Sequence, residues 1–258
     1  MAVLICFGQL GLGLLMLALV FLGTLELRKM LSSSGITFYW LLVLFLGAVL
    51  TLLTPYTAFN GQILIISVLA IFCRGLMSRS EHTKALEETV FSIFALLLLP
   101  FLSSFAILTR AIVVKGDQHD VGLRLVILLF TVTWLTDSAA YFVGKTWGKY
   151  KALPRISPSK TLEGFVGGIL AATISCAIFC ALFLGELSFG HSLILGLLLG
   201  VFGQVGDLFV SLVKRAMRTK DAGSFLPGHG GVLDRMDGFL FNAPILYVFA
   251  KLVLLGPF

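Results

Sequence analysis

The chain has 258 residues, of which 58% are hydrophobic and only 12% are charged, and its mean hydropathy is +1.03. Soluble domains carry about 25% charged residues, so this composition excludes a soluble globular protein and indicates a polytopic membrane protein. The net charge of +6 reflects basic residues near the ends of apolar segments. We expect no nucleic-acid partner.

Apolar runs of about 17 to 25 residues are long enough to cross a bilayer as helices. The sequence contains eight of them, and we predict an all-α, polytopic integral membrane protein with about eight transmembrane helices. The predicted spans are Ala2–Leu25, Ile36–Thr54, Gly61–Met77, Thr89–Leu108, Val121–Gly144, Phe165–Leu187, Ser192–Val213 and Phe239–Leu255.

The segments between the spans are short, and none has a core-sized apolar pattern of its own. We therefore predict one membrane-embedded domain over residues 1–258, with N-terminal helices in 1–110 and catalytic helices and loops in 121–258. The first span lacks a basic leader and a small-residue cleavage site, so it should be retained as a helix. Gly196 and Gly200 share one face of the seventh span, which favours close helix packing.

Lysine and arginine near span ends are retained on the cytoplasmic side of a membrane. The loops after spans one, three, five and seven hold 15 of the 19 basic residues. This asymmetry predicts that both termini lie outside and that the two most basic loops lie together in the cytoplasm.

Ionisable residues inside a membrane are costly and therefore suggest function. Asp137 and Asp207 are two such residues. Asp137 has an alternative interpretation, in which it pairs with a lysine or arginine only to hold helices together. Asp207 is preceded by Gly206 and lies one turn before Ser211 on a polar helix face, which favours a functional role.

The loop after span five contains Ser157-Pro-Ser159-Lys160-Thr161-Leu-Glu163-Gly164. This pattern predicts a helix start, where free backbone N–H groups favour an anion. Ser159 and Lys160 are therefore candidates for a phosphate contact. The alternative is that basic residues here attract anionic headgroups without any chemistry.

The segment from Ser211 to Gly238 concentrates charge and glycine. Glycines 228, 230 and 231 around His229 can turn main-chain N–H groups toward a polyanion. The segment's lysines and arginines can neutralise phosphate, and its aspartates, with Asp207, supply the hard oxygen ligands that Mg²⁺ prefers; at most two need touch the ion. A merely solvated loop is the alternative, but it leaves the glycine spacing without a reason.

The same residues identify a family. Residues 211–237 resemble the signature of phosphatidate cytidylyltransferases, also called CDP-diacylglycerol synthases. The matching pattern is Ser211-Leu-Val-Lys-Arg-(four residues)-Lys-Asp-x-Gly-x-x-Leu-Pro-x-His-Gly-Gly-Val-x-Asp-Arg-Met-Asp237. Asp137-x-x-Ala-Tyr141, residues 157–164 and Gly206-Asp207 are similar to further motifs of that family in the same order. The resemblance is strong over the second half of the chain and rests on hydropathy in the first. Bacterial members usually have nine spans, so we expect this chain to start at their second helix.

The resemblance implies that CTP and phosphatidate react to give CDP-diacylglycerol and pyrophosphate at the cytoplasmic side. It implies Mg²⁺, an assisting monovalent cation such as K⁺, lipid entry from the cytoplasmic leaflet of the bacterial inner (plasma) membrane, and a homodimer. The implied metal ligands are Asp207 and Asp234 first, with Asp221 and Asp237 as ligands or organisers. The implied catalytic residues are Lys214, Lys220, His229 and Arg235, and the implied substrate-binding residues are Ser159, Lys160, Ser211, Arg215, Gly230 and Gly231.

Other functions remain open from the residues alone. A transporter of phosphorylated substrates can also place glycines and acidic residues at a central site, but it predicts inverted repeats, which we do not find between the two halves. A CTP-dependent enzyme acting on another lipid acceptor, or a catalytically silent relative, would retain much of the same pattern.

Overall fold

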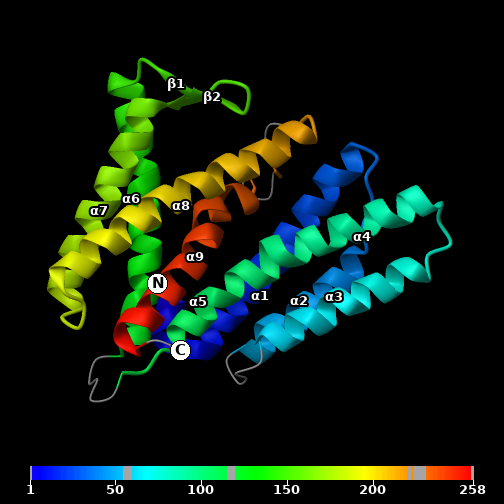
Figure 1. Cartoon of the computed structure of the whole chain (residues 1–258), viewed down its shortest axis with the longest axis horizontal. Helices are drawn as coiled ribbons and strands as arrows, with labels where there is room; N and C mark the ends of the chain where they lie inside the picture. The colour runs from blue at the N-terminus through cyan, green and yellow to red at the C-terminus, as the bar shows by residue number, and fades with distance from the viewer. Residues whose placement is uncertain (1, 55–59, 115–119, 220–221, 224–230, 257–258) are drawn as a thin grey trace. The chain divides into compact units, whose positions relative to one another are not determined.

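The structure is a computed structural model (Figure 1), and it describes residues 2–54, 60–114, 120–219, 222–223 and 231–256. Helices dominate the described residues, and strands form only a short two-stranded hairpin. Within these described ranges, six helical segments are long and apolar enough to cross a membrane, while Trp40–Leu53 and Gly61–Leu76 are shorter apolar helices. The predicted all-α class is confirmed, and the number of helices that cross the membrane stays a prediction.

Contacts divide the chain into two compact units. Unit 1 consists of residues 109–215 and 236–258, and unit 2 consists of residues 2–108 and 216–235. Unit 2 therefore combines the N-terminal helices with most of the signature segment.

The N-terminal helices of unit 2 are separated by short connections. One apolar stretch, His82–Arg110, is helical throughout but contains a π-helical turn at Pro100. Proline has no N–H for the helical ladder, which accounts for the local change of hydrogen bonding. The elements are α1 (Ala2–Ser33), α2 (Trp40–Leu53), α3 (Asn60–Leu76), α4 (His82–Leu96), η2 (Leu97–Phe101) and α5 (Leu102–Arg110).

The elements of the second half of the chain are α6 (Val121–Trp147), β1 (Lys151–Leu153), β2 (Ser157–Thr161), α7 (Leu162–Phe183), α8 (Phe189–Ala216) and α9 (Leu233–Leu254). The helix α6 begins where the Asp120 side chain accepts a hydrogen bond from the Leu123 N–H at 3.1 Å. Such a cap satisfies a backbone donor that has no partner within the helix.

Small residues allow the helices of unit 1 to approach closely. A Cβ atom added at Gly196 would lie 2.7 Å from the Cα of Thr173, and one added at Gly200 would lie 2.9 Å from the Cα of Ile169. The predicted packing role of this glycine pair is confirmed. Phe130 of α6 also stacks on Phe239 of α9, with ring centroids 4.8 Å apart.

The helix start predicted within residues 157–164 is confirmed, but it lies near the end of that segment. The residues Ser157–Thr161 form β2, which pairs antiparallel with β1, and α7 begins only at Leu162. Proline at 158 disfavours continuing a helix through this segment but is tolerated in a short edge strand. Thr161 is the N-cap of α7, and its hydroxyl accepts the Gly164 N–H at 3.2 Å.

The segment from Ser211 to Gly238 is also less of a loop than the hydropathy predicts. Helix α8 continues to Ala216, and α9 begins at Leu233 instead of Phe239. Hydropathy misses these ends because the last turns of α8 and the first turns of α9 carry charged side chains. The helical positions include Ser211, Lys214 and Arg215 on α8, and Asp234, Arg235 and Asp237 on α9.

Candidate active site

An ion pair connects the β-hairpin to α8 in unit 1. The Lys160 ammonium, on β2, contacts the Asp207 carboxylate, and both side chains are about one-third exposed. Lys160 has no further hydrogen-bond partner among the described residues. The sequence assigned Lys160 to phosphate and Asp207 to metal, and the structure brings these two residues together.

A second aspartate, from α9, lies next to the Asp207 carboxylate. Asp237 of α9 is buried, with 6% of its surface exposed, and its carboxyl is within hydrogen-bonding reach of the Asp207 carboxyl. Asp137 of α6 also acts electrostatically on Asp237. Like charges in a poorly solvated place repel one another, so this group of carboxylates favours a cation.

The approach of α8 to α9 at this place depends on Gly206. A Cβ atom added there would lie 2.5 Å from the Asp237 carbonyl oxygen and 2.8 Å from the Phe241 ring. Gly206 therefore lets the Asp207 helix approach the Asp237 helix, as the sequence suggested for a glycine beside an intramembrane aspartate.

The hairpin has a second attachment to α8. The Arg215 Nε donates to the carbonyl oxygen of Ile156 at 3.1 Å, in the turn between β1 and β2. Ser159 is exposed on β2, and Ser211 is buried on α8. Arg215 therefore holds the hairpin, a positioning role that its sequence motif did not indicate.

In unit 2, Asp234 organises the backbone that precedes α9. One oxygen of its carboxylate, Oδ2, accepts the N–H groups of Ala222 and Gly231, each at 3.0 Å. Gly231 was predicted to offer its N–H to a substrate phosphate, and that role stays a prediction.

A buried carboxylate of the first helix, Glu26, contacts the backbone at the start of α9 in unit 2. The Glu26 oxygens accept the N–H groups of Val232 and Leu233, each at 2.9 Å, at the start of α9. Cβ atoms added at Gly223 and Gly231 would lie 2.6 Å and 2.7 Å from Glu26 oxygens. These glycines thus admit an internal carboxylate, and a negative charge at a helix N-terminus is stabilising.

Glu26 lies one residue beyond the predicted first span, which ended at Leu25, so the sequence did not mark it as a functional residue. The rule that identified Asp137 and Asp207, an ionisable residue within an apolar helix, identifies Glu26 once α1 is extended to Ser33. Asp137 was noted as an intramembrane aspartate but was not placed among the metal ligands.

The carboxylates of this site fit a hard divalent cation in part. Among the described residues, no group of three or more histidine, cysteine, aspartate or glutamate side chains is arranged to hold a metal ion. Asp207 and Asp237 nevertheless provide two adjacent carboxyl groups, and Mg²⁺ usually takes one or two carboxylates with water and substrate oxygens completing the shell. The two aspartates therefore fit that coordination.

Comparison with known proteins identifies the family. A model of the cytidylyltransferase family matches residues 1–253. The chain belongs to the cytidylyltransferase family. The family resemblance carried by the signature segment is thereby confirmed.

Named relatives agree with this membership. The phosphatidate cytidylyltransferase of Bacillus subtilis is 50% identical over 131 residues, which is 51% of this chain and 48% of the relative. Those of Staphylococcus saprophyticus and Staphylococcus haemolyticus are 42% and 43% identical over 132 and 127 residues, covering 51% and 49% of each chain, respectively. The chain spans about half the length of the curated relatives it matches.

The remaining residues of the family signature fall in different parts of the structure. Lys214 lies in the last turn of α8, and Arg235 lies exposed in the first turn of α9. Four predicted residues lie outside the described residues: Lys220, Asp221, His229 and Gly230. Their assigned roles stay predictions.

Proposed function

We propose that this cytidylyltransferase-family protein transfers a cytidylyl group from CTP to phosphatidate, giving CDP-diacylglycerol and pyrophosphate. The observation that carries the proposal is the ion pair of Lys160 with Asp207, next to the buried carboxyl group of Asp237. Family membership and the names of the relatives support the choice of nucleotide and lipid. The site combines aspartates that can bind a metal ion with the positive charge of Lys160. A reaction between two phosphate compounds requires such positive charge.

The lipid phosphate is its own nucleophile in this reaction. A phosphate monoester with a second pKa near 6 is largely dianionic at neutral pH. One of its oxygens attacks the α-phosphorus of CTP, and the bond from that phosphorus to the bridging oxygen of the β-phosphate breaks. Pyrophosphate leaves with that electron pair, so the chain needs no strong base.

The work of the protein is to bring two anions together and to neutralise the leaving group. Lys160 supplies positive charge beside the aspartates and would contact a substrate phosphate. Lys214, Lys220 and Arg235, with His229, would hold the triphosphate and stabilise pyrophosphate. Ser159, Ser211 and the glycines of the signature segment would complete the phosphate contacts.

Asp207 and Asp237 would hold Mg²⁺, with Asp234 and Asp221 as further ligands or organisers. When bound, Mg²⁺ supplies charge neutralisation for the phosphate oxygens. The Asp237 position ranks higher than the sequence suggested, because its side chain is buried against Asp207. A monovalent cation such as K⁺ is part of the same proposal.

The apolar helices make this an integral membrane protein, and we propose that it lies in a bacterial inner membrane with its catalytic segments in the cytoplasm. Phosphatidate would enter sideways from the cytoplasmic leaflet and leave its acyl chains in hydrocarbon. Polar backbone and side chains at that depth are tolerated only where surrounding helices separate them from lipid. A homodimer is the proposed assembly.

The test is an assay of the purified chain in detergent micelles with CTP, Mg²⁺ and phosphatidate, following both pyrophosphate and CDP-lipid. We expect the two products to form in equal amounts. Replacing phosphatidate by diacylglycerol separates phosphate acceptors from alcohol acceptors. Absence of CDP-lipid with the wild-type chain, or full turnover by a folded Asp207→Ala variant, would overturn the proposal.

A further inference from the structure

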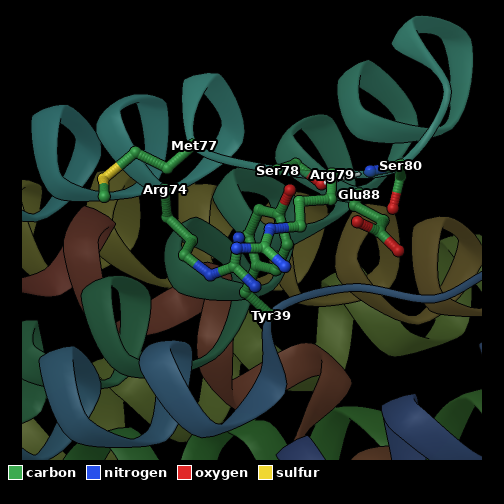
Figure 2. Close-up of a pocket in the computed structure, with 7 residues that line it drawn as sticks. All are labelled: Tyr39, Arg74, Met77, Ser78, Arg79, Ser80 and Glu88. Atoms are coloured by element: carbon green, nitrogen blue, oxygen red, sulfur yellow. Dashed lines mark hydrogen bonds between the residues drawn. The ribbon is translucent and has the colours of Figure 1, made fainter.

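Unit 2 contains a polar pocket that the proposed reaction does not use. It has a volume of about 650 Å³ and lies between Tyr39, which precedes α2, the turn between α3 and α4, and Glu88 of α4. Figure 2 shows the lining side chains, which come from these three places and from the last turn of α3. All of them belong to unit 2.

Two arginines bring positive charge to this pocket. Arg74 ends α3 and places its guanidinium 4.6 Å from the centre of the Tyr39 ring, and Arg79 follows in the turn. Figure 2 shows both side chains extending into the pocket. Within the described ranges, neither guanidinium forms an ion pair with a carboxylate. Two neighbouring guanidinium groups without a counter-ion favour an anion with several oxygens, such as phosphate.

The acidic residue of the pocket does not neutralise them. The Glu88 carboxylate accepts a hydrogen bond from the Thr37 hydroxyl at 2.7 Å, which connects α4 to the segment before α2. Glu88 is therefore held in the pocket wall by Thr37. It also limits the ligand to one that presents its negative charge on the arginine side.

Hydroxyl groups complete the polar lining. The Ser78 oxygen accepts the Ser80 N–H at 3.3 Å, so the Ser78 hydroxyl proton remains available to a ligand. The Tyr39 hydroxyl is enclosed and has no hydrogen-bond partner in the described part of the chain. The Tyr39 backbone is fixed, because its N–H donates to the Ser92 hydroxyl at 2.9 Å. An enclosed hydroxyl without a partner is costly unless a ligand or water satisfies it.

The surface beside the pocket is strongly apolar. Leu76 and Met77, between the two arginines in sequence, are 87% and 79% exposed. Further along α3, Leu69 and Phe72 are also exposed. In a membrane protein such side chains face lipid. A soluble phosphate compound would gain nothing from them, whereas a lipid would lay its acyl chains along α3.

We propose that this pocket binds the phosphate headgroup of an anionic phospholipid, with Arg74 and Arg79 on the phosphate oxygens and the acyl chains against α3. The Ser78 hydroxyl donates to the same phosphate. This site is independent of the proposed cytidylyl transfer, and neither arginine belongs to the signature segment.

The test measures lipid binding directly. The whole chain is placed in nanodiscs of zwitterionic phospholipid that contain a small fraction of spin-labelled phosphatidylglycerol. The motionally restricted fraction of the labelled lipid is measured. Arg74→Gln/Arg79→Gln should weaken the association about tenfold or more, as expected for the loss of two charge-assisted contacts. Lys84→Gln is the matched control, because it removes one exposed cation from the same segment without touching the pocket.

The second arm separates the sources of phosphate. Inorganic phosphate at millimolar concentration should not displace the labelled lipid, whereas unlabelled phosphatidylglycerol should. Displacement by inorganic phosphate would overturn the lipid assignment in favour of a soluble anion. Arg74→Lys/Arg79→Lys keeps both charges and should retain most of the binding, which guards against a folding defect in the glutamine variant. Equal binding by wild type and the double glutamine variant, or an equal loss in Lys84→Gln, would overturn the site itself.

Discussion

The Lys160 ammonium forms an ion pair with the Asp207 carboxylate, and this contact joins strand β2 to helix α8. The pair lies beside the buried carboxyl group of Asp237. The Lys160 ammonium offsets the negative charge of the adjacent carboxylates. In the proposed reaction the same cation is available to a substrate phosphate.

Lys160→Gln should therefore lower kcat/KM for CTP by about 100-fold, a size typical for the loss of one charge-stabilising donor. The measurement is pyrophosphate release at varied CTP. The matched control is Lys151→Gln, an exposed lysine on the neighbouring strand β1, which should keep its activity. A glutamine variant at 160 that turns over at the wild-type rate would remove Lys160 from the active site.

Asp237 provides a second prediction, about metal dependence. If Asp207 and Asp237 share a divalent cation, Asp237→Asn should raise the Mg²⁺ concentration for half-maximal activity by about tenfold or more, as for other changes around metal ligands. Removal of divalent ions with a chelator should abolish activity, and added Mg²⁺ should restore it. Activity is followed over a Mg²⁺ titration for each variant.

The control for this titration is Glu87→Gln, because Glu87 is an exposed carboxylate on α4. It should leave the Mg²⁺ curve unchanged. An Asp237→Asn variant whose curve superimposes on that of the wild type would show that Asp237 serves packing and not metal binding.

The first and last helices are connected through Glu26, which gives a third prediction. Glu26→Ala leaves the N–H groups of Val232 and Leu233 without their acceptor in a buried place. An unsatisfied buried donor costs about 1–3 kcal/mol, so the thermal midpoint of unfolding should fall by several degrees. Because the start of α9 carries Asp234, catalytic activity should fall as well.

Glu26→Gln distinguishes the contributions of shape and charge. The glutamine keeps one oxygen acceptor and nearly the same volume, so it should recover part of both stability and activity. The order wild type, glutamine variant, alanine variant is expected in thermal unfolding and in CDP-lipid formation. Equal unfolding midpoints for the wild type and Glu26→Ala would contradict the capping role.

The sequence predicted some of these features better than others. The hydropathy pattern located the helical segments, and the signature motif identified the family, because both depend on local residue order. The ends of α8 and α9 were missed, since charged turns such as the one with Asp234 and Asp237 reduce the apolar signal. Glu26 and residues 232–233 are 206 or more positions apart, so their contact requires the tertiary fold.

The aspartates also differ in what local sequence and the tertiary fold reveal about them. Local spacing named Asp207, Asp234 and Asp237 as candidates, and the family resemblance ranked Asp207 and Asp234 first. Burial, which depends on neighbouring helices, did not enter that ranking. The structure places Asp137 with Asp207 and Asp237, and Asp234 with the backbone of Ala222. The rank of Asp237 therefore rises for a reason that the motif does not contain.

The last prediction concerns the close approach of α8 and α9. Gly206→Ala would place a methyl group 2.5 Å from the Asp237 carbonyl oxygen, which is backbone and cannot move aside alone. Overpacking of this kind costs about 1–3 kcal/mol, and the shift needed to relieve it would move Asp207 away from Asp237. We expect lower thermal stability together with a loss of activity larger than the loss of folded protein explains.

Gly190→Ala is the matched control, since Gly190 lies on the same helix and a Cβ atom there meets nothing within 4 Å. It should be neutral or slightly stabilising, because alanine favours helix more than glycine does. The two variants are compared by thermal unfolding in detergent and by CDP-lipid formation per folded molecule. If Gly206→Ala and Gly190→Ala behave alike in both measurements, the spacing of α8 and α9 at Asp207 does not limit the reaction, and the positions of the carboxylates must tolerate displacement.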